Sequence, residues 1–178
     1  MRKKNQSTIF IKECICKAFI DLLYTKKNNE ITISEICQKA GFGRTTYYRY
    51  FTNKKEDLIL FISHLRWKQC KIEHADEAKK DEGMLLLQHI YYHKNFFIML
   101  THQKLDDLIF KIFYQEFGRK KDENEILGYG KAFFAGGYFG VIYEWIQNGC
   151  IDTPQEISLK FVQGCIYAHQ LATKKQER

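Results

Sequence analysis

A seven-residue run that begins at Arg44, with the sequence RTTYYRY, concentrates guanidinium, hydroxyl and phenol groups in a short stretch. Such groups donate hydrogen bonds to phosphates and base edges, and arginine paired with guanine is the commonest specific base contact in protein–DNA complexes. In a helix beginning here, positions 44, 45, 48 and 49 share one face, and Tyr47 points to the core. We therefore predict a helix that enters the major groove. Arg44 would pair with guanine, with Thr45 and Arg49 at base edges, and Thr46 would contact DNA or bond its own helix backbone.

Other polar side chains nearby are suited to phosphates, whose contacts set the register of a protein on DNA without reading its sequence. Tyr48 and Tyr50 offer hydroxyls, and Lys54 offers an ammonium group in the first turn of the next expected helix. Thr32 and Ser34 stand at the start of the preceding helix and are predicted to contact the flanking strand. The alternative at each position is an ordinary surface residue or a helix cap.

Two short helices joined by a turn are expected to position these side chains. A Thr-x-x-Glu capping box begun by Thr32 starts a helix over 33–40, and Gly41 ends it in the left-handed conformation. Gly43 then precedes the second helix, over 44–51. The pattern is typical of a helix-turn-helix.

The remainder of the chain is also expected to be helical, because it contains one proline and little strand-type alternation. Apolar residues at spacings of three and four predict a first helix over 8–25. Asn53 and Glu56 form a second capping box, which predicts a helix over 53–73. A mixed-charge stretch, 74–83, follows. Beyond it we predict apolar helices near 84–93, 95–101, 104–119, 123–148 and 154–173.

Net charge is concentrated in the first third of the chain. Of the 28 Lys and Arg residues and 21 Asp and Glu residues, 12 and 5 lie in residues 1–56, which gives this segment the whole net charge of +7. The remaining residues balance to zero. A polyanion such as double-stranded DNA is the partner this predicts, since counterion release drives binding to basic segments. A solvated lysine-rich surface is the alternative.

The same segment resembles the TetR/AcrR family of bacterial regulators. The resemblance rests on the helix-turn-helix, on Tyr48-Arg49-Tyr50-Phe51 and on Asn53-Lys54-Lys55-Glu56-Asp57-Leu58, and it covers residues 8–65. Gly43 departs from the family, which often has a serine there. Residues 90–97 and 135–146 are similar to a C-terminal subtype, that of regulators related to activators of dihydroxyacetone kinase operons.

This resemblance implies an all-α, TetR-like fold with two domains. A three-helix DNA-binding domain, 1–52, is linked by helix 53–73 to a larger helical domain, 74–178, for effector binding and dimerisation. Family members usually repress transcription and leave a palindromic operator when a small molecule binds. We therefore expect a cytoplasmic repressor with an unknown small-molecule effector. The alternative is a DNA-bound regulator or activator controlled by a protein partner.

Aromatic residues are dense beyond residue 90 and can line an apolar effector pocket, although core packing also explains them. The candidates for that pocket are Tyr91, Tyr92, Phe96, His102, Phe113, Phe117 and Phe133.

A symmetric homodimer is expected through helices 123–148 and 154–173. Gly136, Gly137 and Gly140 lie on one helix, where each glycine costs about 1 kcal/mol relative to alanine, and close helix–helix approach would offset this. We place them, with Tyr143, at the dimer interface. A dimer would present two recognition helices about 34 Å apart to a palindrome.

Several other classes of protein are not indicated. The sequence shows no nucleophile–base pair, phosphate loop or metal-ligand cluster, which predicts no enzyme activity, no cofactor and no metal. The six cysteines lack zinc-type spacing, and reduced thiols are expected. The longest uncharged apolar stretch, 132–143, is shorter than the roughly 20 residues that span a bilayer, so no membrane partner is expected.

Overall fold

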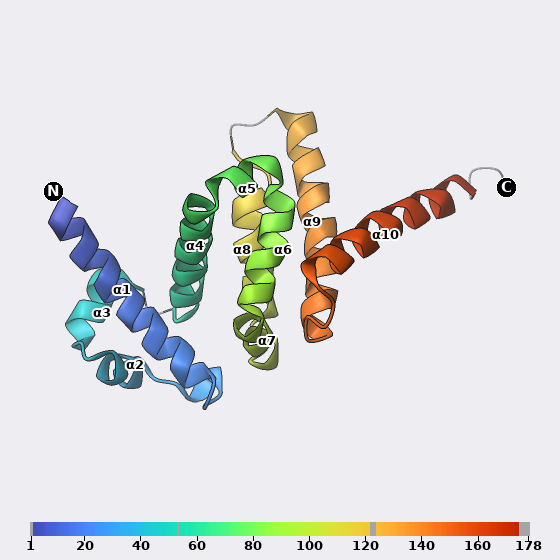
Figure 1. Ribbon diagram of the computed structural model, residues 1–178. Helices are drawn as coiled ribbons and strands as arrows, with labels where there is room; N and C mark the ends of the chain where they lie inside the picture. Colours follow the sequence, from blue (N-terminus) through green and yellow to red (C-terminus); the bar gives the residue numbers. More distant parts are fainter. Residues whose placement is uncertain (1, 53, 122–123, 175–178) are drawn as a thin grey trace. The chain divides into compact units, whose positions relative to one another are not determined.

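A computed structural model describes residues 2–52, 54–121 and 124–174 of the chain (Figure 1). These residues form helices and no strand, which confirms the all-α fold class. The elements are α1 (Arg2–Leu23), the 3-10 helix η1 (Asn28–Glu30), α2 (Ile33–Ala40), α3 (Arg44–Tyr50), α4 (Glu56–Glu73), α5 (Ala75–Lys80), α6 (Glu82–Tyr92), α7 (Lys94–His102), α8 (Asp106–Phe117), α9 (Glu125–Gln147) and α10 (Pro154–Lys174).

The chain divides into two compact units. Unit 1 comprises residues 1–69 and 99–116, and unit 2 comprises 70–98 and 117–178. The end of α7 and most of α8 thus belong with the N-terminal helices, although they lie in the C-terminal domain that the sequence predicts. That functional boundary, at 52 and 74, remains a prediction.

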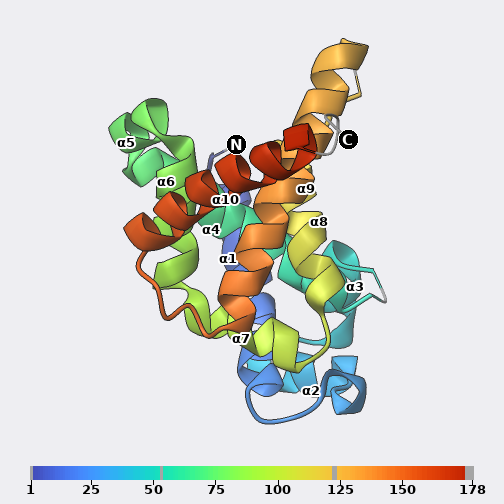
Figure 2. The ribbon, with the colours of Figure 1, turned by 90° about the vertical axis from the view of Figure 1, so that its right-hand side faces the viewer.

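Unit 1 is built around the contact of α1 with α2 and of α2 with α3. Its core contains the fully buried side chains Ile15, Phe19, Leu23, Ile36 and Tyr47. They come from the apolar faces of three helices, and their burial favours this packing through the hydrophobic effect. In unit 2, α6 packs against α5 and α10, and α10 lies across α6 (Figure 2).

Three helices end in the same left-handed motif. At the end of α2, Gly41 has φ 75°, and the N–H groups of Phe42 and Gly41 donate to the carbonyls of Cys37 and Gln38. This is a Schellman motif, and it sets the sharp turn between α2 and α3. The ends of α7 and α9 repeat it, with Lys104 and Gly149 in the left-handed position.

Some helix boundaries differ from the predicted ones. α1 begins at Arg2, not at residue 8, since no helix breaker separates the two. The mixed-charge stretch 74–83 contains α5, whose alanine, glutamate and lysine residues favour helix. α4 begins at Glu56, and the capping role predicted for Asn53 lies outside the described residues. The side chain of Thr52 instead accepts from Lys54 N–H and donates to Asp57.

Candidate nucleic-acid interface

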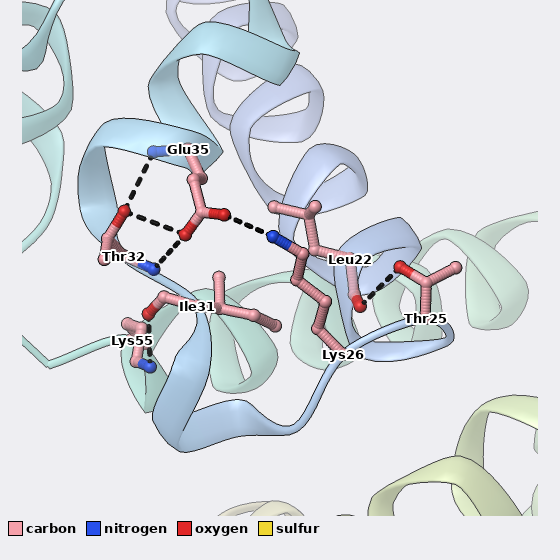
Figure 3. Close-up of polar contacts among 7 residues, drawn as sticks. All are labelled: Leu22, Thr25, Lys26, Ile31, Thr32, Glu35 and Lys55. Atoms are coloured by element: carbon pink, nitrogen blue, oxygen red, sulfur yellow. Dashed lines mark hydrogen bonds and ion pairs between the residues drawn. The ribbon is translucent and has the colours of Figure 1, made fainter.

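The start of the helix-turn-helix is a capping box, as the sequence predicts (Figure 3). Thr32 Oγ1 accepts from Glu35 N–H at 3.2 Å, and a Glu35 side-chain oxygen accepts from Thr32 N–H at 2.8 Å. The hydroxyl of Thr32 also donates to that oxygen at 2.9 Å. In the DNA-free protein Thr32 is thus the helix cap, the alternative given for this position, and its contact with DNA stays a prediction.

Glu35 also forms an ion pair with Lys26, at 2.5 Å between Nζ and Oε1. The Lys26 side-chain hydrogen bond, followed by those from Thr32, lowers the pKa of Glu35 to about 2 from 4.5. The ion pair links the turn that follows α1 to the first turn of α2. The carboxylate of Glu35 also lies at the N-terminus of α2, where negative charge is favourable.

Acid is expected to weaken this junction. A carboxyl whose pKa is lowered by folding stabilises the protein above its unfolded pKa, and that contribution is lost as the pH falls from 4.5 toward 2. Glu35→Gln retains a capping acceptor and cannot titrate, so its free energy of unfolding should fall less over this range than that of the wild type. Denaturant unfolding at several pH values measures the difference, which should shrink with added salt because the pair is exposed. Identical pH dependence in both proteins would contradict the assignment.

The exposed face of α3 carries the side chains predicted to read DNA. Arg44, Thr45, Tyr48 and Arg49 are exposed, whereas Thr46 and Tyr50 are half-buried and Tyr47 is fully buried. This division follows the helical period of the sequence. Burial raises the pKa of the Tyr47 phenol to about 12, and among the described residues its hydroxyl has no hydrogen-bond partner.

The arginines of this face are not paired with acidic side chains of the described residues. Within the described parts of the chain, Arg44 and Arg49 form no ion pair. The guanidinium of Arg44 lies 5.9 Å from the ring of Tyr48, one helical turn away, which keeps the two side chains together on the surface. The guanidinium of Arg44 and the hydroxyl of Tyr48 are thus available to an anionic partner.

Tyr50 is supported from α1. The ammonium group of Lys12 lies 5.8, 5.7 and 4.8 Å from the ring centroids of Tyr50, Phe51 and Phe61. These cation–π contacts join α1, α3 and α4 within unit 1. Sequence reasoning did not assign this role to Lys12.

The two lysines before α4 behave differently. Lys54 is exposed but precedes α4, so it does not lie in the helix's first turn as predicted. Lys55 turns inward, and its ammonium group donates to the backbone carbonyl of Ile31 (Figure 3). The same group donates to the carbonyl of Asn28. Burial lowers the pKa of Lys55. No local sequence signal distinguishes it from its neighbour. Ser34, at the start of α2, is exposed as expected.

The residues predicted to line an effector pocket do not fall within one unit. His102 and Phe113 belong to unit 1, and the other five belong to unit 2. Phe96 and Phe113 are buried, Tyr91 and Phe117 are half-buried, and His102 is exposed. Tyr92 and Phe133 are 84% and 85% exposed, so they do not line an enclosed cavity within unit 2. The effector pocket stays a prediction.

Two further observations concern membranes and metals. No helix in the described ranges is long and apolar enough to cross a membrane. No group of three or more potential metal-ligating side chains occurs in the same ranges.

The glycines predicted at a dimer interface lie on the surface of α9. Gly136, Gly137 and Gly140 are exposed, and a Cβ atom added to any of them meets no atom within 4 Å. Tyr143 is half-buried. The close helix approach that would offset their cost is therefore not made within the described part of the subunit.

α9 and α10 also expose many large apolar side chains. Among the side chains of α9 and α10 whose burial the structure describes, those more than half exposed are Ile126, Leu127, Tyr129, Phe133, Phe134, Leu159, Val162, Ile166 and Tyr167. In Figure 1 the second half of α10 extends away from α9. Exposed apolar surface is typical of an interaction site where it forms a continuous patch.

An all-α fold with a helix-turn-helix near its start, whose second helix is rich in cations and hydroxyl groups, is the arrangement found in helix-turn-helix DNA-binding proteins. Comparison with known proteins agrees. Residues 84–164 match the family described as the transcriptional regulator C-terminal region, of TetR type. In this region the chain is therefore similar to transcriptional regulators of the TetR family.

A similar curated protein is the HTH-type dhaKLM operon transcriptional activator DhaS of Lactococcus lactis subsp. lactis (strain IL1403). It is 29% identical over 120 residues, which cover 59% of this chain and 64% of that protein. The matched part thus spans less than two thirds of the relative's length.

Proposed function

We propose that this protein binds double-stranded DNA in a sequence-specific manner, as a homodimer in the cytoplasm, and regulates transcription. The exposed face of α3 carries the proposal, because its arginines have no ion-pair partner among the described residues. Arg44 would read a base, with Thr45 and Arg49 beside it. The remaining proposed DNA contacts are Thr32, Ser34, Thr46, Tyr48, Tyr50 and Lys54.

Homodimerisation is supported by the open glycines and exposed apolar residues of α9 and α10. Helix pairs from two subunits would cover both, in an isologous interface. Such a dimer presents two recognition helices to a palindromic operator.

The sign of regulation has two candidates. The sequence resemblance favours a repressor that a small molecule releases from its operator. The name of the relative favours an activator, and an activator controlled by a protein partner is the second candidate. Transcript levels in a deletion strain separate them: loss of a repressor raises expression of the target genes, and loss of an activator lowers it.

DNA binding is tested with a duplex from the region upstream of the protein's own gene. Fluorescence anisotropy over a range of salt concentrations should show log K falling steeply with log salt. Lys54→Ala should reduce that slope by about one, since one phosphate contact is lost. Lys111→Ala is the matched control, because this exposed lysine pairs with Asp107 on α8. Binding that is weak and independent of salt would refute the proposal.

A further inference from the structure

The connection between α1 and α2 is held by a side chain that lies far along the chain. The Nε2 group of Gln103 donates to the carbonyls of Leu23 at 2.5 Å and Lys26 at 2.9 Å. Its Oε1 accepts from Asn28 N–H at 2.9 Å. These residues all belong to unit 1. One side-chain amide thus bonds three backbone groups of a single turn.

The same turn is held from a second direction. The carbonyl of Asn28 accepts from the ammonium group of Lys55, and so does the carbonyl of Ile31, at 2.8 Å. Both backbone groups of Asn28 therefore bond to side chains from outside the turn. Leu23 ends α1, and the carbonyls at the end of a helix lack intrahelical partners, so the bond from Gln103 satisfies a group that water would otherwise hydrate.

Gln103 is itself held firmly at the corner between α7 and α8. Leu105 N–H donates to the Leu100 carbonyl at 2.9 Å, and Lys104 N–H donates to the Thr101 carbonyl at 3.0 Å. These are the two bonds of a Schellman motif. Lys104 occupies its left-handed position with φ 57°. The backbone of this corner thus determines where the Gln103 amide lies.

The held turn leads directly into the helix-turn-helix. Thr32 follows Ile31 and caps α2, and α2 packs against α3. A displacement of the turn would displace the start of α2 and, with it, the exposed face of α3. The α7–α8 corner is in this way connected to the proposed DNA contacts by three hydrogen bonds.

We infer that Gln103 is a positioning residue for DNA recognition, through which the α7–α8 corner holds the α1–α2 turn and the helices that follow it. A ligand or partner that moves this corner would act on the reading helix through the Gln103 amide. The three hydrogen bonds from Gln103 to the α1–α2 turn are called the clasp below. The effect on DNA rests on the proposed function, whereas the clasp itself does not. Glutamine suits the position because its amide supplies two donors and an acceptor; glutamate at neutral pH lacks the donors.

The clasp is tested first without DNA, in the full-length protein. Gln103→Met keeps the length of the side chain and removes all three hydrogen bonds. Amide exchange followed by NMR should be faster at Asn28 in this variant, because its N–H loses its acceptor, and unchanged at core residues of α1 such as Ile15. Gln155→Met, at an exposed position of α10, is the control. Unchanged exchange at Asn28 would overturn the clasp.

The second test measures binding to the duplex described above. Gln103→Met should lower affinity about tenfold, a typical coupling between sites, with the salt slope unchanged because no phosphate contact is lost. Gln103→Glu keeps the acceptor for Asn28 and places a carboxylate against two carbonyls. As the pH is lowered to about 5, protonation of some of this carboxylate restores a donor. Affinity relative to the wild type should then partly recover, which a change in packing alone would not produce.

The outcomes separate the two proposals. Wild-type protein that fails to bind the duplex refutes the proposed function, and the exchange experiment still decides the clasp. Wild-type affinity in Gln103→Met, combined with faster exchange at Asn28, overturns the positioning role and leaves DNA binding intact. If Gln103→Met does not fold, the pH dependence of Gln103→Glu decides: no recovery relative to the wild type overturns the inference.

Discussion

Replacing Arg44 by alanine and Tyr48 by phenylalanine together is expected to lower affinity for the target duplex at least a hundredfold. A bidentate arginine–guanine contact contributes about 2 kcal/mol. A hydroxyl hydrogen bond to a charged phosphate contributes about 1.5 kcal/mol. Both side chains are exposed on α3, so their loss leaves the fold intact. Fluorescence anisotropy measures affinity, and circular dichroism checks helix content and melting temperature.

The adjacent tyrosine provides a matched control. Tyr47→Phe removes a hydroxyl that is buried and has no partner among the described residues, so it should leave DNA affinity unchanged and preserve or raise stability. Single variants then separate the roles within the double variant. Arg44→Ala should reduce discrimination between operator and unrelated DNA, whereas Tyr48→Phe should weaken binding to both alike. Wild-type affinity in the double variant would exclude α3 as the recognition helix.

Substitution of Gly140 by leucine is expected to break the homodimer without unfolding the subunit. A Cβ atom added at Gly140 meets no other atom on the surface of α9. Leucine also favours the helix over glycine by about 1 kcal/mol. Across a close helix–helix contact, the same side chain would overpack the interface by about 1–3 kcal/mol, on both sides of a twofold axis. The dissociation constant should therefore rise at least about tenfold. DNA affinity should fall with it, because one subunit reads only half a palindrome.

Sedimentation velocity over a range of concentrations tests this expectation. Gly140→Ala should give a smaller effect in the same direction, since only one methyl group is added. Tyr92→Ala removes an aromatic ring that is 84% exposed and lies outside the predicted interface, so it should leave assembly unchanged. A wild-type monomer at micromolar concentration, or an intact Gly140→Leu dimer, would place the interface elsewhere or remove it.

The helix-turn-helix shows how far local sequence signals reach. The bounds of α2 agree with the prediction at both ends, and α3 ends one residue earlier than predicted. The Thr32–Glu35 capping box and the left-handed Gly41 act between residues that are at most five apart. Their geometry depends on the local chain alone, which makes it predictable. The periodicity of α3 likewise indicates that Tyr47 is buried and that Arg44 and Tyr48 are exposed.

Local signals leave a role open where one group has two possible uses. The hydroxyl of Thr32 suits a phosphate by type, and it also bonds Glu35 in the cap that the same residue forms. Tyr92 and Phe133 have the composition expected of a pocket lining, yet both lie on the surface. The type of an apolar residue does not indicate whether it faces a core, a cavity or a partner subunit.

The sequence alone determined the all-α class, the helix-turn-helix, the location of its positive charge and the face of α3 that is exposed. These depend on composition and on interactions between neighbours along the chain. Only the tertiary structure distinguished Lys55, which bonds backbone carbonyls, from the exposed Lys54 beside it. It alone brought Gln103 to a turn 75 to 80 residues away. A side chain's reach across the fold depends on how distant segments pack, and no local pattern records that.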